Sequence, residues 1–301
     1  VVTASLSKDK IQFSQKRFFS SPISAKKSKD KTKWEIPITY KQGKVNFGEA
    51  GFYRTAYSGE LLEKLREPIQ NKKLTPRDRL GVIRDLFALA EAGTISTIDA
   101  LEFLSAYRNE DNYTVWLEIA SGLSRIEQLM AKKPTTSGGI PQKAVNNLNS
   151  LTIDLFFPVF SRLGWTKKEN EAHADSLLRS LVISRLGRAE EKDIIQEARN
   201  KYFIIKKGGK VNPDIRGAIY VVIASNGGQK EYKQMLKMYK GENLHEEKNR
   251  IGNALGDFKN KKILSSACAF AMSKNVRIQD SIGILSSVAS NSLGRDIWWN
   301  F

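Results

Sequence analysis

The side chains that most often bind metals or act as nucleophiles are scarce in this chain. Its 301 residues include two histidines and one cysteine. His173 lies in Glu-Ala-His-Ala-Asp and His245 in Leu-His-Glu-Glu. Neither therefore belongs to a His-Glu-x-x-His helix, which presents two imidazoles to zinc and a glutamate as base. We predict no metal site and no catalytic residue, and we expect both histidines at the surface or beside a groove.

Other catalytic motifs are also missing from the sequence. There is no Gly-x-x-x-x-Gly-Lys-Ser/Thr phosphate loop, and residues 207–210, Lys-Gly-Gly-Lys, form a basic turn before a helix. There is no Gly-x-Ser-x-Gly elbow to support a serine nucleophile. Cys268 lies in an apolar run and has no second cysteine to pair with. We expect a buried thiol in a reducing, cytoplasmic setting.

Length and composition are those of a globular protein. A chain of 301 residues can bury a substantial core, and fractions of 41% hydrophobic and 27% charged residues are ordinary for a soluble protein. No apolar stretch approaches the roughly 18 residues needed to cross a membrane, so we expect no membrane partner. The chain begins Val1-Val2 without a methionine, which is typical of a fragment or a processed product.

The net charge of +17 raises nucleic acid as a possible partner. The charge is uneven, because residues 1–45 hold eleven Lys and Arg against three Asp and Glu. Much of this excess lies in residues 26–33, which we expect to form a solvated hairpin loop. Separation from a more acidic parent protein explains the imbalance, so we do not expect a nucleic acid partner.

Residues 1–57 have the signals of β-strands. Apolar residues from Trp34 to Tyr40 alternate with Glu, Pro and Thr, which is the period of a half-buried strand. Pro37 removes a hydrogen-bond donor, which predicts an edge strand or a bulge. Residues 11–19 frame another strand. Because few strands are visible, we expect a partial β-sandwich domain over residues 1–57.

From residue 58 onward the hydrophobic period is that of helices. Thr75 and Pro76 predict the start of a helix that Gly93 ends, and Asn212-Pro213 predicts the start of another. Residues 135–139 are the one plausible flexible interruption. We predict a mainly-α protein, in which residues 58–301 form antiparallel helix pairs stacked as a HEAT-like superhelical domain.

The junction between these parts carries a distinctive motif. Residues 45–54 read Val-Asn-Phe-Gly-Glu-Ala-Gly-Phe-Tyr-Arg. This run resembles the Asn-x-Gly-x-x-Gly-Phe/Tyr-Tyr-Arg-Val-x-Tyr stretch of M1-family zinc aminopeptidases. Only six residues separate Ile38 from Val45, a shorter connection than is usual in that family. Further landmarks resemble the family in the same order, at residues 15–18, 34–38, 77–89, 107–116, 213–216, 246–250, 277–280 and 294–298.

The resemblance implies the C-terminal portion of an M1 aminopeptidase, with a small β-sandwich and an ERAP1-like helical domain. In this family the helical domain caps the active-site cleft, encloses the peptide-binding cavity and limits substrate length. The implied partners are peptides and the enzyme's own N-terminal catalytic domain. The Zn²⁺ cofactor, its ligands and the Gly-x-Met-Glu-Asn motif belong to that upstream domain, and none of these motifs is present here.

Four residues are our candidates for functional positions. Arg216 and Arg250 each lie within a family landmark on a helical stretch, and a guanidinium group can bind a peptide carboxylate through two hydrogen bonds. The alternative for both is a solvated or neighbour-paired charge. Tyr53 and Arg54 are expected to fix the sandwich against the first helices, with the active-site cleft as the alternative. Four tryptophans are expected to pack between helices: Trp116, Trp165, Trp298 and Trp299.

One alternative function belongs to a different class. A helical-repeat scaffold can bind protein or nucleic acid through a basic surface, and this explains the charge of +17 directly. It does not explain the strand segment or the ordered landmarks. Salt-dependent DNA binding would favour it, since phosphate contacts give steep salt dependence.

Overall fold

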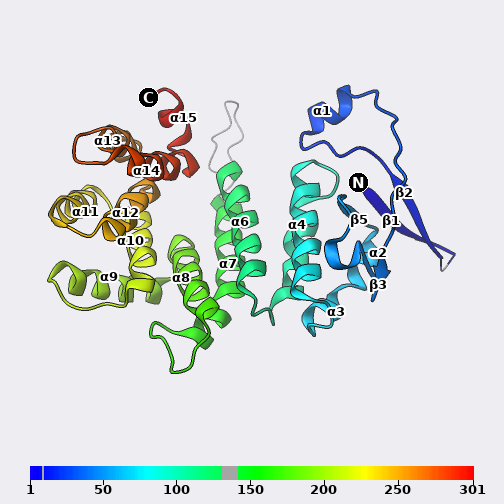
Figure 1. The fold of residues 1–301 in the computed structure, drawn as a ribbon, viewed down its shortest axis with the longest axis horizontal. Helices are drawn as coiled ribbons and strands as arrows, with labels where there is room; N and C mark the ends of the chain where they lie inside the picture. The colour runs from blue at the N-terminus through cyan, green and yellow to red at the C-terminus, as the bar shows by residue number, and fades with distance from the viewer. Residues whose placement is uncertain (9, 131–141) are drawn as a thin grey trace. The chain divides into compact units, whose positions relative to one another are not determined.

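The computed structural model describes residues 1–8, 10–130 and 142–301 (Figure 1). The predicted flexible interruption at residues 135–139 lies outside them. The chain divides into two compact units, residues 1–122 and 123–301. Helices predominate in the described residues, so the predicted mainly-α class is confirmed. The proposed boundary between residues 57 and 58 stays a prediction.

The strands of unit 1 form a small sheet and a separate hairpin. Strand β1 (Val2–Ser7) pairs antiparallel with β2 (Lys10–Gln15) and parallel with β5 (Thr55–Tyr57), in the order β2-β1-β5. Strands β3 (Tyr40–Lys41) and β4 (Lys44–Val45) form the hairpin. Its two turn residues, Gln42 and Gly43, both have positive φ, as a tight hairpin turn requires. This hairpin forms most of the short connection between Ile38 and Val45.

The half-buried strand predicted from Trp34 to Tyr40 is wrong except at its last residue. The segment is irregular, and Trp34 is 44% exposed. It is attached to β2 by the Gln15 amide, which donates to the Trp34 carbonyl at 2.7 Å and accepts from its N–H at 2.9 Å. Pro37 lacks an N–H, and residues 34–39 pair with no strand of the two described sheets. The alternation of apolar residues from Trp34 to Tyr40 was therefore not sufficient to form a strand.

The helices of unit 1 pack against both faces of the sheet. On one face, Leu89 packs with Val1 and Ala56, while on the other Leu61 packs with Ala4. The helices and 3₁₀ turns of this unit are α1 (Pro22–Lys27), Phe47–Glu49, α2 (Gly59–Glu63), α3 (Arg66–Gln70), α4 (Pro76–Glu91), α5 (Thr97–Phe103) and Leu104–Tyr107. Helix α6 (Tyr113–Met130) belongs partly to unit 1 and partly to unit 2.

Helix α4 begins and ends where the sequence predicts. The Thr75 hydroxyl accepts a hydrogen bond from the N–H of Asp78 at 3.2 Å, and Pro76 occupies the first turn. Gly93 adopts a φ of +65° just beyond the helix, a conformation that favours glycine. The basic run at residues 26–33 differs from the predicted hairpin loop, because its first two residues end α1.

Unit 2 is a two-layered stack of helices. Helices α8, α10, α12 and α14 contact one another in succession, and α9, α11 and α13 each contact the helix that follows (Figure 1). This is the predicted HEAT-like arrangement. The elements are α7 (Gln142–Leu163), α8 (His173–Arg188), α9 (Lys192–Lys206), α10 (Pro213–Ser225), α11 (Gln229–Gly241), α12 (His245–Ala254), a 3₁₀ turn (Leu255–Asp257), α13 (Lys261–Ala271), α14 (Ile278–Ser290) and α15 (Arg295–Trp299).

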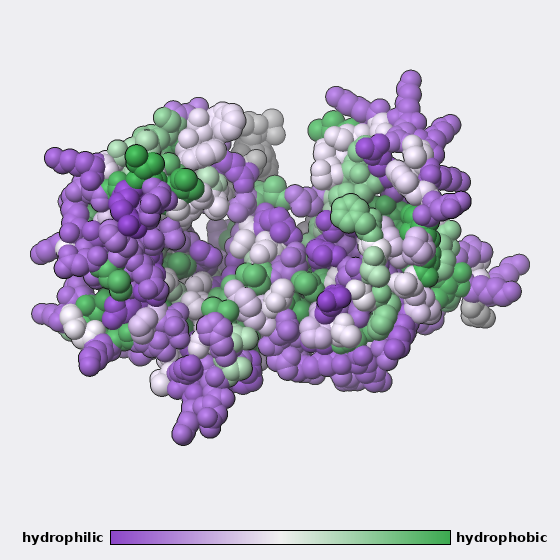
Figure 2. Space-filling model, in the orientation of Figure 1, coloured by the Kyte–Doolittle hydropathy of each residue, from purple (hydrophilic) through white to green (hydrophobic). Residues whose placement is uncertain are grey.

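Helix α10 forms the centre of this stack. As predicted, it begins at Asn212, whose side chain accepts from the N–H of Asp214 at 2.9 Å. It packs closely against α8, where Gly187 leaves room for it. A Cβ placed on Gly187 would lie 2.3 Å from a methyl carbon of Val222 in α10. On the face drawn in Figure 2, hydrophilic residues cover most of unit 2 and hydrophobic ones form small separate patches. No described helix has the length and apolar character to span a bilayer.

Candidate functional site

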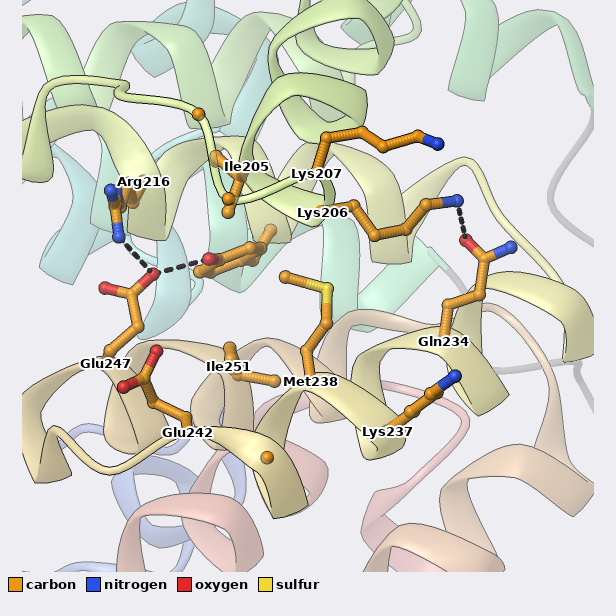
Figure 3. Close-up of a pocket in the computed structure, with 14 residues that line it drawn as sticks. Ile205, Lys206, Lys207, Arg216, Gln234, Lys237, Met238, Glu242, Glu247 and Ile251 are labelled. Carbon is orange, nitrogen blue, oxygen red and sulfur yellow. Dashed lines mark hydrogen bonds and ion pairs between the residues drawn. The ribbon is translucent and has the colours of Figure 1, made fainter.

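A pocket of about 710 Å³ lies in unit 2, where the ends of α9 and α11 meet α10 and α12 (Figure 3). Its lining comes from the last turn of α9 and the glycine turn after it, from α10, from the second half of α11, and from α12. The volume falls in the range of roughly 300–1,000 Å³ typical of small-ligand sites. The pocket is therefore large enough to receive part of a peptide.

Glu247 is the buried acid of this pocket, with 2% of its surface exposed. One carboxylate oxygen accepts from the Tyr220 hydroxyl at 2.5 Å and from Arg216 Nη1 at 3.3 Å. The other accepts from Arg250 Nη1 at 2.8 Å. Two guanidinium groups and a hydroxyl thus satisfy both oxygens, which a buried carboxylate requires. Burial raises the pKa of Tyr220, and its hydrogen bond to Glu247 raises this pKa further, so the hydroxyl remains a donor.

Both predicted substrate-binding arginines therefore meet on one carboxylate. Arg216 lines the pocket, and its Nε donates to the Val211 carbonyl at 3.1 Å. Arg250 does not line the pocket, and its second partner is Glu246. Sequence reasoning missed Glu247 itself, although it lies in the same landmark as Arg250. A role of either arginine in substrate binding stays a prediction.

Three lysines form the opposite end of the pocket. Lys206 ends α9 and Lys207 follows it, while Lys237 projects from α11 (Figure 3). Lys206 Nζ donates to the side-chain oxygen of Gln234 at 3.3 Å, and Lys207 lies 5.6 Å from the centre of the Phe203 ring. Within the described part of the chain, none of the three is paired with a carboxylate. Sequence reasoning noted only the basic turn that contains Lys207.

Tyr53 and Arg54 both lie at the junction of strand β5 and helix α4, inside unit 1. Arg54 Nη1 donates to Asp85 of α4 at 3.0 Å, and the N–H of Thr55 donates to the other Asp85 oxygen at 2.8 Å. Burial raises the pKa of Asp85 despite these two donors. Tyr53 packs beside β1 and β4, and a Cβ on Gly51 would lie 2.2 Å from its ring. Their role at a domain junction stays a prediction.

The zinc implied by the family resemblance does not fit any set of side chains described here. His173 and His245 are exposed at the first residues of α8 and α12, and Cys268 is buried in α13. Across residues 1–8, 10–130 and 142–301, no three His, Cys, Asp or Glu side chains gather as metal ligands would. The buried thiol agrees with the expectation for Cys268.

Comparison with known proteins gives a consistent result. Residues 43–301 match the family model of the ERAP1-like C-terminal domain. Aminopeptidase M1-A of Oryza sativa subsp. japonica is 31% identical over 265 residues, which are 86% of this chain and 29% of that protein. Aminopeptidase M1 of Arabidopsis thaliana is 30% identical, with the same two shares. The puromycin-sensitive aminopeptidase of Caenorhabditis elegans is 26% identical over 86% of this chain and 27% of its own length.

The chain thus spans less than a third of the relatives it matches. The matched region includes the junction motif of residues 45–54 and continues through every helix of unit 2. From these matches we conclude that the chain belongs to the ERAP1-like C-terminal domain family, as the C-terminal portion of an M1 aminopeptidase.

Proposed function

We propose that this chain is the non-catalytic C-terminal region of a zinc aminopeptidase, which caps the active-site cleft and encloses the peptide-binding cavity. In this role it helps to select peptides by their length and C-terminus, while the upstream domain supplies the zinc and removes N-terminal residues. The observation that carries the proposal is the match of residues 43–301 to the ERAP1-like C-terminal domain, together with relatives that are aminopeptidases. The implied partners are peptides and the protein's own catalytic domain.

The physical support comes from the stacked helices of unit 2. Such a stack buries its own core and presents a continuous surface to a ligand. Arg216 and Arg250 remain our candidates for contacts with the peptide, because the first lines the pocket and both are held at a fixed position by Glu247. A cytoplasmic setting also stays part of the proposal. Its support is the single cysteine, Cys268, which is buried and free.

The test is to assay this chain beside a form extended at its N-terminus to the natural start. We expect peptide turnover and bound zinc in the extended form only. Peptides of increasing length with one shared N-terminal residue then test length selection. We expect the dependence of KM on length to weaken in Arg216→Gln and Arg250→Gln, with kcat for the shortest peptide unchanged.

Two outcomes would contradict the proposal. An extended form that is inert and free of zinc would refute it and would favour the helical-repeat scaffold, whose nucleic acid binding would then show steep salt dependence. An active extended form whose KM does not vary with peptide length would leave the family membership in place. It would refute the part of the proposal that concerns length selection.

A further inference from the structure

Helix α11 carries a row of lysines on its outward side. They lie at the spacing i, i+3, i+7 and i+10, and all four are exposed: Lys230, Lys233, Lys237 and Lys240. Three buried residues mark the side of this helix that faces the stack: Tyr232, Met235 and Tyr239. At about 100° per residue, the lysines fall within an arc of about 80° on the other side, and the row is about 15 Å long.

The end of helix α9 extends this row. Lys206 Nζ donates to the side-chain oxygen of Gln234 on α11 at 3.3 Å, so the end of α9 lies beside α11. The side chains of Lys206, Lys207 and Lys237 project to one side in Figure 3, away from Arg216. We call the following six lysines the basic face: Lys206, Lys207, Lys230, Lys233, Lys237 and Lys240.

The protein does not neutralise the basic face itself. Within the part of the chain that the structure describes, none of the six lysines is paired with a carboxylate. Residues 199–241 hold ten Lys and Arg against two Asp and Glu. Of these two acids, Glu231 accepts from the N–H of Gly228 at 2.8 Å, and Asp214 lies in the first turn of α10. The basic face therefore presents a positive field to an anionic partner.

Two exposed apolar side chains accompany these charges. Phe203 and Ile204, near the end of α9, are 57% and 42% exposed. The ammonium group of Lys207 lies 5.6 Å from the centre of the Phe203 ring. An aromatic ring and an aliphatic side chain beside lysines suit a partner whose surface is anionic and whose interior is apolar.

We propose that the basic face binds the surface of a membrane that contains anionic lipids. Its lysines contact the charged headgroups, while Phe203 and Ile204 enter the boundary between headgroups and acyl chains. This contact is peripheral and needs no helix that crosses the bilayer. It revises the expectation of no membrane partner, which rested on crossing segments alone. The proposal goes beyond the proposed function and does not depend on it.

Two other anionic partners fit these residues less well. An exposed ion pair with a protein carboxylate strengthens binding by about fivefold at most and often by nothing, whereas each basic residue near an anionic bilayer contributes about fivefold. Single-stranded nucleic acid is bound by successive aromatic side chains that stack on its bases. Of the aromatic side chains described on α9 and α11, only Phe203 is exposed. Neither partner gives Ile204 an apolar phase to enter.

The first experiment measures binding of this chain to lipid vesicles by sedimentation. One set of vesicles is phosphatidylcholine alone, and the other contains phosphatidylserine as about a third of its lipid. We expect binding at least about tenfold tighter to the anionic vesicles at low salt, and a loss of this preference as salt screens the charges. Equal binding to both kinds of vesicle, or binding to neither, would overturn the proposal.

The second experiment compares two triple variants that remove equal charge. The test variant replaces lysines of the basic face that do not line the pocket: Lys230→Gln, Lys233→Gln and Lys240→Gln. The matched control replaces exposed lysines of unit 1: Lys26→Gln, Lys27→Gln and Lys29→Gln. We expect the test variant to weaken binding to anionic vesicles by about thirtyfold or more, and the control by less than about fivefold. Circular dichroism checks that both variants are folded. If the control weakens binding as much, net charge alone is responsible and the proposal fails.

The third experiment separates a membrane from other polyanions. We expect Phe203→Ala to weaken binding to anionic vesicles by about threefold or more, because it removes an apolar side chain from the interface. The control is Phe13→Ala on β2, where Phe13 is 44% exposed in unit 1. A single-stranded oligonucleotide and polyglutamate are then tested at the same concentration of charge. Tighter binding of either one than of the anionic vesicles would identify that partner class and overturn the proposal.

These results are independent of the test of the proposed function. If the extended form is an active zinc enzyme but this chain shows no preference for anionic vesicles, only the membrane proposal fails. If this chain prefers anionic vesicles but the extended form is inert and zinc-free, the proposed function fails and the membrane-binding surface stands.

Discussion

Two regions of the molecule treat their basic side chains in opposite ways. In unit 1, Arg79 is buried and its guanidinium donates to both oxygens of Glu110, at 2.6 and 2.8 Å, and to the Leu74 carbonyl at 2.6 Å. In the pocket of unit 2, Lys207 and Lys237 stand exposed without a carboxylate partner among the described residues. Burial requires a partner for the charge of Arg79, since an unpaired buried charge is costly. Exposed cations carry no such requirement, so they remain available to a ligand.

The largest effect is expected where the pairing in unit 1 is broken. Arg79→Met leaves Glu110 buried without its cation, and this should lower the free energy of unfolding by about 3–5 kcal/mol. The measurement is urea unfolding followed by circular dichroism, which reports the loss of helix. The matched control is Arg77→Met in the exposed first turn of α4, which should cost less than about 0.5 kcal/mol. Similar losses in both variants would contradict a structural role for the buried pair.

The next effect is expected at the acidic end of the pocket. Glu247→Gln keeps the shape of the side chain but removes the charge that holds Arg216 and Arg250. We expect a loss of about 1.5–3 kcal/mol in the free energy of unfolding, the range for hydrogen bonds to a charged group. Glu246→Gln is the control, because Glu246 contacts Arg250 but its side chain is 68% exposed. If Glu246→Gln proves the more costly change, Glu247 is not the centre of this cluster.

The parts of the fold that could be predicted depend on signals within a few residues. The Thr75 and Asn212 caps were predicted correctly because the cap, the following proline and the acid that supplies the N–H are neighbours in sequence. A strand at Trp34 needs a partner strand elsewhere in the chain, which no local pattern supplies, and residues 34–39 have none among the described strands. The burial of the tryptophans was also predicted only in part. We expected both Trp116 and Trp299 to pack between helices, but Trp116 is buried and Trp299 is 79% exposed.

The site was predicted less completely than the fold. The sequence pointed to Arg216 and Arg250 through separate landmarks, but not to their meeting on Glu247. The Arg250 contact is three positions along one helix, a spacing that could have been predicted. The Arg216 contact joins residues 31 positions apart, and no local pattern indicates it. Lys237 is one of several lysines on α11, and only the packing of α11 beside the end of α9 places it at the pocket rather than in open solvent.

Unit 2 also contains a buried ion pair, and its contribution to stability should depend on pH. The buried Arg179 donates to both oxygens of Glu171, and its hydrogen bonds lower the pKa of Glu171 to about 2. Because this pKa is lower than the unfolded value of 4.5, the pair stabilises the fold fully above pH 4.5. That contribution is lost as the pH falls from about 4.5 to 2. The difference in melting temperature between the wild type and Glu171→Gln should therefore shrink across this interval. A constant difference from pH 6 to pH 3 would contradict the pairing.

The smallest effect on stability is expected at the lysine end of the pocket, because the described chain gives these lysines no carboxylate partner to lose. Lys237→Gln removes an exposed charge with no carboxylate partner in the described chain, so the free energy of unfolding should change by less than about 0.5 kcal/mol. A slight gain is the expected sign, since the chain carries a net charge of +17 and the lysines repel one another. Urea unfolding beside Lys240→Gln measures this difference. A loss above about 1 kcal/mol in Lys237→Gln alone would show that Lys237 holds the fold together, as Arg79 does. The contrast between the two regions would then disappear, and with it the reason to regard the lysine end as free for a ligand.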